Sequence, residues 1–453
     1  FSERGRRVLP LAERLVPTAA TLLWVAYVAR VDWPVLVIVP AVLLSFAVIA
    51  IAVHGRLALD RPAEEHLTRF YLWVSAGGAL ATAFVALAAP LIFEDVYEYP
   101  LLLVGALAAI ALLAPRAVRG DRTPGAALRA AGGRLAPLAV LGVLVVAALA
   151  PAPGPSATFV SVLLVLGAVA VALGTSPRAL ALSTAATIAM ALVLFSPHPV
   201  ERVRSFFGVT DIVEAAGGEA FAEIHGTTLH GLQYRDARAG EPTAYFVREG
   251  PLGEVVAEVQ SAHAEGADIG VVGLGIGTIA AYARPDDTLT YLEIDQTVVD
   301  LARDERYFTY LADAAAEPEV LLGDGRLLLA EGPADRFDLL VLDAFSSDSV
   351  PTHLLTREAM ETYDRSLQPG GLVAFQLTNR HFDLVGAVGT TARAAGLDAR
   401  TKSFEPSGPG HVTALPSTWL VVGEARDLAR FDALGWEPAP DGPVLTDAYP
   451  DVT

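Results

Sequence analysis

Cysteine is absent from this chain of 453 residues, and lysine occurs once, at Lys402. The absence of cysteine excludes a disulfide, a zinc site built on thiolates and a cysteine nucleophile. We predict no metal site. Arginine supplies nearly all of the positive charge, and we attribute this preference to genome composition rather than to mechanism.

Charge is distributed unevenly along the chain. Residues 1–200 contain 14 arginines and 10 acidic residues, whereas the remainder contains 18 basic and 41 acidic residues. The net charge of −19 therefore combines a membrane-like half with a strongly acidic half. Nucleic-acid-binding proteins present a basic face, so we predict no nucleic-acid partner. The acidic half is compatible with a cationic substrate, although a solubilising surface is the simpler explanation of its charge.

Long apolar runs recur through the first 200 residues. A helix needs about 20 mostly apolar residues to cross the hydrocarbon core of a bilayer. We therefore predict a transmembrane helical domain over residues 1–200, integral to the cell membrane and in contact with the lipid bilayer. Its seven helices are expected at 15–29, 33–53, 70–93, 100–114, 135–150, 158–174 and 180–195. A signal peptide has a single such run. Because the chain begins at Phe1 without methionine, further helices upstream are an open expectation.

After residue 205 the pattern changes to short β-type runs separated by glycine and proline. We predict a small β-strand domain over residues 205–262, with strands at 220–224 and 229–234. Beyond it, apolar runs at 269–272, 289–292, 320–322, 339–342 and 372–375 alternate with helical patterns. Short continuous apolar runs are typical of strands buried on both faces. We predict an α/β Rossmann-like domain over residues 263–453, built on a doubly wound parallel sheet.

The first strand of this sheet runs into three alternating glycines, Gly273, Gly275 and Gly277. Glycines at this point let the backbone pass close to a ligand at the carboxyl edge of the sheet, before the helix that we expect next. The second strand ends at Glu293, where a carboxylate can accept hydrogen bonds from both hydroxyls of a ribose. The alternative is a helix cap followed by a surface acid.

The third and fourth strands also end in acidic residues. Asp324, which precedes Gly325, can take the exocyclic amine of an adenine ring, or it can form an ordinary Asx turn. Asp343 can remove the proton from an attacking amine, or it can cap the following helix. Asp348 and His353 follow in the same loop as candidate substrate-binding residues, with an ordinary loop role as the alternative.

These residues resemble the spermidine synthase (polyamine aminopropyltransferase) family, and more closely its membrane-fused relatives. The resemblance covers residues 206–449 and includes the strand-end residues above. Further matching motifs are Thr227-Thr-Leu-His230-Gly-Leu-Gln233, Pro242-Thr-Ala-Tyr245 and Leu445-Thr-Asp447. It implies a class I methyltransferase-like form of the Rossmann fold, decarboxylated S-adenosylmethionine as co-substrate, a small amine or polyamine as acceptor, and a homodimer.

The resemblance also implies roles for individual residues. The residues expected to hold the nucleotide are Gly273, Gly275, Gly277, Glu293, Asp324 and Gly325. Gln233 is expected beside the thioether and propyl part, Asp343 as the base, and Tyr245, Asp348 and His353 at the acceptor. Two departures fall on the acceptor side. Tyr245-Phe-Val stands where soluble members usually have Tyr-His-Glu, and four residues separate Asp343 from Asp348, where those members usually have Asp-x-x-Asp-Pro.

Three functions are compatible with this sequence. The first is a membrane-tethered aminopropyltransferase. The second is a methyltransferase that uses S-adenosylmethionine on a membrane-associated acceptor. The third is a catalytically silent ligand-sensing domain coupled to a transporter-like bundle. No lysine or arginine occurs between the glycine loop and Arg284 to pair with a cofactor carboxylate, which favours the decarboxylated nucleotide.

Arginines in the loops predict the orientation of the helices. Segments 54–69 and 115–134 hold three and five arginines, so both are predicted to be cytoplasmic. Counting through the last three helices then places residues 205–453 outside the cell, which conflicts with a nucleotide made in the cytoplasm. We expect a cytoplasmic C-terminal domain, with one of the last three apolar runs not spanning the membrane.

Overall fold

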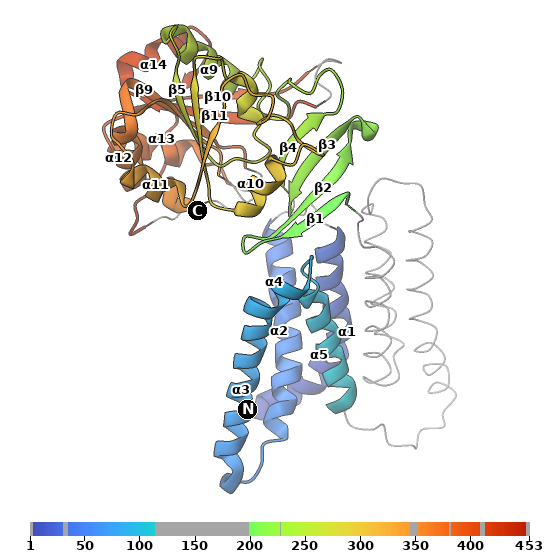
Figure 1. Ribbon diagram of the computed structural model, residues 1–453. Coiled ribbons are helices and arrows are strands. Elements are labelled where there is room, and N and C mark those ends of the chain that lie inside the picture. Colours follow the sequence, from blue (N-terminus) through green and yellow to red (C-terminus); the bar gives the residue numbers. More distant parts are fainter. Residues whose placement is uncertain are drawn as a thin grey trace. The chain divides into compact units, whose positions relative to one another are not determined.

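The computed structural model describes residues 3–29, 35–113, 199–226, 228–344, 351–379, 382–407 and 413–449. The chain divides into two compact units, Phe1–His198 and Pro199–Thr453 (Figure 1). The boundary that we predicted at residue 262 falls inside the second unit.

The described part of the first unit is helical. Its elements are α1 (Glu3–Ala29), α2 (Val35–Leu59), the 3₁₀ turn η1 (Glu64–His66), α3 (Leu67–Ala83), the π-helical turn η2 (Phe84–Ala88), α4 (Ala89–Ile92) and α5 (Glu98–Leu113). They cover the first four helices predicted from the sequence. The three helices predicted at 135–150, 158–174 and 180–195 lie outside the described residues.

Two stretches of the first unit, Leu36–Leu59 and Glu64–Ile92, are long and apolar enough to cross a membrane. Only 11% and 6% of their most apolar windows are buried within the protein. Charge is confined to a few positions. Glu13 on α1 pairs with Arg56 on α2, and Arg56 Nη2 donates to Glu13 Oε2 over 2.9 Å. Because both side chains are largely buried, each needs the other as its partner.

The second unit begins with a four-stranded antiparallel sheet in sequence order: β1 (Glu201–Arg204), β2 (Val209–Ala215), β3 (Ala220–His225) and β4 (Thr228–Tyr234). Alternation along β3 turns Phe221, Glu223 and His225 toward one face of this sheet. Phe221 packs there with Ile276 and Phe308 from the larger part of the unit. The small sheet therefore brings polar as well as apolar side chains to the larger sheet.

The larger sheet has eight strands in the order β12-β10-β11-β9-β8-β5-β6-β7. They are β5 (Asp268–Val272), β6 (Thr288–Glu293), β7 (Glu319–Leu322), β8 (Phe337–Leu342), β9 (Leu367–Gln376), β10 (Asp398–Phe404), β11 (Ser417–Gly423) and β12 (Glu437–Pro438). The five predicted strands pair in parallel. Beyond these five strands, β11 lies antiparallel between β9 and β10, and β12 pairs antiparallel with β10.

Helices cover both faces of the larger sheet (Figure 1). They are α9 (Pro251–Ala262), α10 (Gln296–Ala302), α11 (Gly325–Glu331), α12 (Arg357–Ser366), α13 (Val385–Ala394) and α14 (Ala425–Asp432). Side chains of α9, α10 and α14 pack on one face around Trp419, and those of α11, α12 and α13 on the other around Phe375. Each fully buried large side chain stabilises the fold by about 1.5–3 kcal/mol, which explains the continuous apolar runs.

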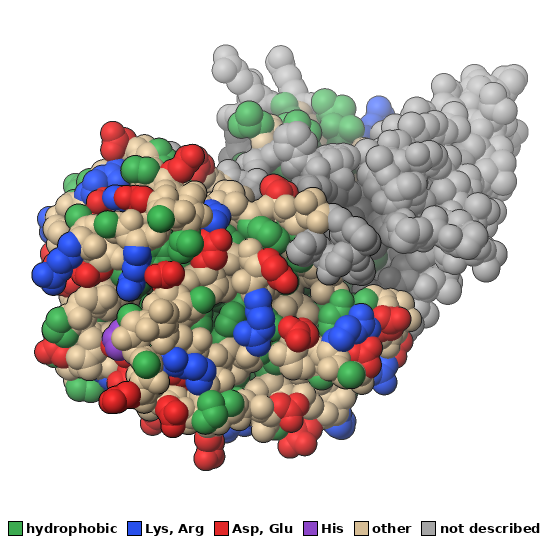
Figure 2. Space-filling view, turned by 90° about the horizontal axis from the view of Figure 1, so that it is seen from above, with side chains coloured by type: hydrophobic (Ala, Val, Ile, Leu, Met, Phe, Trp, Pro, Cys, Tyr) green, Lys and Arg blue, Asp and Glu red, His purple; other side chains and the backbone are tan. Residues whose placement is uncertain are grey.

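The surface of the second unit carries acidic and basic side chains interspersed with neutral ones on the face drawn in Figure 2. Ion pairs such as Arg306 with Asp304, 2.5 Å apart, also occur at the surface of this unit. Pairs of this kind contribute little to stability because water screens them.

Candidate active site

A cavity of about 240 Å³ lies at the carboxyl ends of β5, β6, β7 and β8. This size approaches that of small-molecule sites, which begin at about 300 Å³. Five acidic side chains line it: Glu223, Glu293, Asp295, Asp324 and Asp343. The described lining residues include no lysine or arginine. The cavity therefore offers carboxyl groups that can pair with a cation, which favours a cationic ligand.

The glycine loop forms one wall of the cavity through Gly273 and Gly275. Gly273 has φ +96°, and a Cβ atom there would lie 2.2 Å from the carbonyl oxygen of Asp343. Only glycine allows β5 and β8 to end so close together. Gly277 does not line the cavity. Its left-handed backbone precedes the 3₁₀ turn η4 (Thr278–Tyr282), which takes the place of the helix predicted after the loop.

Glu293 is buried at the end of β6, and its carboxylate is held by backbone amides. Oε2 accepts a hydrogen bond from the amide of Leu274 and Oε1 one from the amide of Asp295, both over 2.8 Å. Burial raises the pKa of Glu293 despite these amides. Glu293 is thus a fixed, buried carboxylate rather than the surface acid of the alternative interpretation, and each of its oxygens keeps a lone pair for a ribose hydroxyl.

Asp324 has two roles in the structure. Its Oδ1 accepts a hydrogen bond from the amide of Leu327 over 3.0 Å and so caps α11. Its Oδ2 lies in the cavity wall, 3.4 Å from Nε2 of His353. Gly325 lines the cavity beside it. Capping therefore fixes the carboxylate at the strand end without removing it from the cavity.

Asp343 lines the cavity at the end of β8. Burial and the nearby charge of Glu293 raise its pKa to about 7. A base with a pKa near the working pH is effective in proton transfer. Asp343 does not cap the next helix, because Pro351 precedes the 3₁₀ turn η5 (Thr352–Leu354) and Thr356 caps α12. Asp348 lies outside the described residues.

Besides Gly277, two predicted site residues are not among the described residues that line the cavity. Gln233 is buried, and its amide donates to the Ala239 carbonyl (2.9 Å) and to Thr309 Oγ1 (3.1 Å). Gln233 Oε1 accepts from the Thr309 amide over 2.7 Å. Both polar atoms of the Gln233 amide therefore form hydrogen bonds within the protein, and these bonds hold Thr309 next to β4. The Tyr245 hydroxyl donates to the Leu229 carbonyl, and burial followed by the charge of Asp343 raises its pKa.

Sequence reasoning missed three polar residues of the small sheet that line the cavity, Glu223, His225 and His230. Two of them have an atom with no hydrogen-bond partner among the described residues, Glu223 Oε2 and His230 Nε2. Burial and the charges of Glu293 and Asp295 raise the pKa of Glu223 to about 8, whereas burial lowers that of His230 to about 4. The available signal was the alternation along β3, which puts Glu223 on the same face as Phe221.

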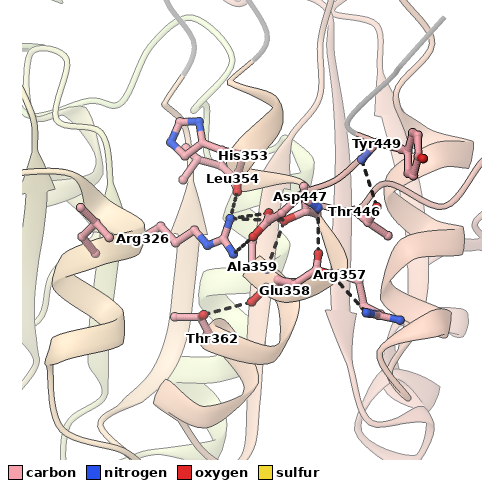
Figure 3. Close-up of polar contacts among 12 residues, drawn as sticks. Arg326, His353, Leu354, Arg357, Glu358, Ala359, Thr362, Thr446, Asp447 and Tyr449 are labelled. Atoms are coloured by element: carbon pink, nitrogen blue, oxygen red, sulfur yellow. Dashed lines mark hydrogen bonds and ion pairs between the residues drawn. The ribbon is translucent and has the colours of Figure 1, made fainter.

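A polar network closes the edge of the site near His353 (Figure 3). Arg326 Nη1 and Nη2 donate to the two carboxylate oxygens of Asp447, and Nη1 also donates to the His353 carbonyl, all over 2.8 Å. Thr356 Oγ1 donates to Asp447 over 2.7 Å. The C-terminal segment thereby holds the loop that carries His353 against α11.

The strand order, with one antiparallel strand inserted between β9 and β10, defines a Rossmann-like fold of the methyltransferase class. Its cavity lies where this class binds nucleotides, outside the carboxyl ends of the parallel strands. Over part of its length the chain is similar to polyamine aminopropyltransferases.

Comparisons with known proteins support this placement over part of the chain. No family model matches. The chain is 34% identical over 110 residues to the polyamine aminopropyltransferase of Vibrio vulnificus, which is 23% of this chain and 36% of that protein. It is 28% identical over 154 residues to putrescine N-methyltransferase 2 of Nicotiana tabacum, 33% of this chain and 41% of that protein. The chain thus spans about two fifths or less of these relatives.

A solved structure described as a probable spermidine synthase from Corynebacterium glutamicum superposes with a TM-score of 0.40 at 17% identity. The match covers 55% of this chain and 98% of that one.

Proposed function

We propose that the second unit transfers an aminopropyl group from decarboxylated S-adenosylmethionine to an amine acceptor. The observation that carries this proposal is the set of five carboxyl side chains that line the cavity, with no lysine or arginine among its described lining residues. The decarboxylated nucleotide is cationic and lacks the carboxylate that would need a basic partner. The acceptor, an amine, is also cationic near neutral pH.

The residues of the cavity fit such a nucleotide. Glu293, fixed by two backbone amides, would accept the ribose hydroxyls, and Asp324 would accept the adenine amine. Gly273 and Gly275 leave room for the backbone to approach the ligand. The nucleotide, when bound, supplies a carbon activated by the adjacent sulfonium, with methylthioadenosine as the leaving group.

Asp343 would remove a proton from the acceptor. A protonated amine has no lone pair to form the new carbon–nitrogen bond, so a proton must leave before the attack. The proton would pass from the amine nitrogen to an oxygen of Asp343, and the carbon–sulfur bond would break as the carbon–nitrogen bond forms. The pKa of about 7 lets Asp343 accept this proton near neutral pH and release it to solvent afterwards.

A methyltransferase is the second candidate, because the relatives include putrescine N-methyltransferase 2. The two activities differ in the nucleotide and in the product. The full chain, purified in detergent, is titrated with S-adenosylmethionine and with its decarboxylated form, and then assayed with a panel of polyamines. We expect preferential binding of the decarboxylated form and amine-dependent release of methylthioadenosine. Release of S-adenosylhomocysteine would indicate the methyltransferase, and binding of neither compound would contradict both.

We also propose that the first unit tethers this enzyme to a membrane. The supporting observation is the pair of apolar stretches Leu36–Leu59 and Glu64–Ile92, whose side chains are mostly unburied. Partition of the chain into the membrane fraction, resistant to carbonate extraction, is the expected result. Recovery in the soluble fraction would contradict the proposal.

A further inference from the structure

Glu223 is a cavity residue that the proposed reaction leaves without a role. It lies in the middle of β3, its exposed fraction is 1%, and it lines the cavity. Its Oε2 has no hydrogen-bond partner among the described residues. Burying a carboxylate without a partner is costly, and an apolar side chain at this position would be more stable. An unpartnered acid in a cavity wall therefore points to a ligand that supplies the missing partner.

The described groups that line the cavity around Glu223 include no lysine or arginine. Glu293 at the end of β6 and Asp295 at the start of α10 oppose its ionisation, and Tyr245 interacts with it electrostatically. His225 and His230 lie on the same small sheet, and burial lowers the pKa of each.

The cavity offers a second atom without a partner, Nε2 of His230. His230 is on β4, the strand that pairs with β3, and Glu223 is in register with the neighbouring Gly231. His230 is neutral at physiological pH, because burial lowers its pKa to about 4. An ammonium group has three N–H donors. A neutral imidazole nitrogen can accept a hydrogen bond from one of them, and a carboxylate can accept from another.

We propose that Glu223 and His230 form a binding site for a primary ammonium group, and that Glu223 ionises when this group enters. This inference rests on the proposed function. The proton of neutral Glu223 passes to solvent, and the carboxylate forms an ion pair with the ammonium group. Two sources can supply this group: the aminopropyl arm of the decarboxylated nucleotide, or the amine acceptor.

Glu223→Gln tests the proposal because glutamine has the shape of the neutral acid and does not ionise. Glu214→Gln is the matched control, since Glu214 lies on neighbouring β2 with an exposed side chain paired to Arg235. The full chain in detergent is titrated with decarboxylated S-adenosylmethionine, with methylthioadenosine, which lacks the ammonium group, and with putrescine. KM for putrescine is measured as well.

We expect Glu223→Gln to lower the affinity for the ammonium-bearing ligand at least tenfold. The affinity for methylthioadenosine should change by less than twofold. Loss confined to decarboxylated S-adenosylmethionine assigns the site to the aminopropyl arm, and a rise in KM for putrescine alone assigns it to the acceptor. Calorimetry at pH 7 in buffers of different ionisation enthalpy is expected to detect about one more proton released on binding to the wild type than on binding to Glu223→Gln.

Unchanged affinities together with unchanged proton release would overturn the proposal, even if the wild type binds both ligands and turns over. If the wild type binds neither sulfonium compound, the proposed function fails and this inference falls with it. Glu223→Asp covers the case in which the glutamine variant does not fold. It keeps the ionisable group and shortens its reach, so we expect proton release with weakened binding, and wild-type affinity would contradict the site.

Discussion

Arg326 on α11 and Asp447 near the C-terminus are joined by two hydrogen bonds of 2.8 Å across 121 residues of sequence (Figure 3). Asp447 also accepts a hydrogen bond from Thr356 Oγ1, and its amide donates to Glu358. The hydrogen bonds from Arg326 and Thr356 lower the pKa of Asp447 to about 2. A bidentate arginine pair is stronger and more directional than a single contact between exposed charges.

Replacing Asp447 with asparagine should therefore loosen this network. We expect the melting temperature to fall by about 2–4 °C, the shift for about 1 kcal/mol in a unit of this size. Nucleotide affinity should fall as well, because His353 and Asp324 line the cavity next to this network. Asp441→Asn is the control, since Asp441 forms a 2.8 Å pair with Arg393 but is almost fully exposed. Equal effects of the two variants in a thermal melt would contradict the special role of the network.

Asp343→Asn should remove the base while keeping the shape of the side chain. We expect kcat to fall about 10²- to 10⁴-fold, with the dissociation constant of the nucleotide nearly unchanged. Because the deprotonated form is the active one, the wild-type kcat should rise with pH and level off above about 7. Glu331→Gln at the exposed end of α11 serves as control. A wild-type rate that is flat from pH 5 to 8 would exclude Asp343 as the base.

Glu293→Gln should weaken binding of the adenosine part of the ligand. A carboxylate that accepts from ribose hydroxyls contributes about 1.5–3 kcal/mol, so we expect affinity to fall about 10- to 150-fold. The loss should be the same for methylthioadenosine and for the decarboxylated nucleotide, because both carry the ribose. Asp300→Asn, an exposed substitution on nearby α10, should change neither. A loss limited to one of the two ligands would place Glu293 elsewhere than at the ribose.

Stability of the second unit should fall as pH rises through the neutral range. Folding raises the pKa of Asp343 to about 7 and that of Glu223 to about 8, whereas unfolded carboxyl groups titrate near pH 4. Between these values the folded state holds more protons than the unfolded one. These groups therefore favour folding most at low pH, and this contribution is lost as pH rises. Melts from pH 5 to 9 should show a smaller decline for Glu223→Gln, and equal declines would contradict this assignment.

Orientation can be tested with a reporter fused after Thr453. We expect the reporter to be cytoplasmic, where the nucleotide is made. An external signal would instead support the count of arginine-rich loops through seven spanning helices. A reporter placed in the loop between α2 and α3, which should be cytoplasmic in either case, calibrates the assay.

The strands that line the site were predictable because their information is local. A run of apolar residues buried on both faces, followed by glycine or an acid, identifies a parallel strand and its carboxyl end, as at Gly273, Glu293, Asp324 and Asp343. Parallel strands end at one edge, so these residues meet without further information. β10 escaped prediction because polar side chains such as Arg400 and Lys402 interrupt its apolar pattern.

The sequence by itself thus determined the class of fold, the strand-end residues that line the cavity and the apolar character of the first unit. Tertiary structure decided which polar residues of the small sheet enter the cavity. Alternation along β3 puts Glu223 on one face, but only the packing of Phe221 against Ile276 and Phe308 shows that this face turns toward the larger sheet. The same packing engages Gln233 with Thr309 instead of the ligand. The packing of one sheet against the other depends on contacts between segments that are distant in sequence. The periodicity of a single strand does not predict these contacts.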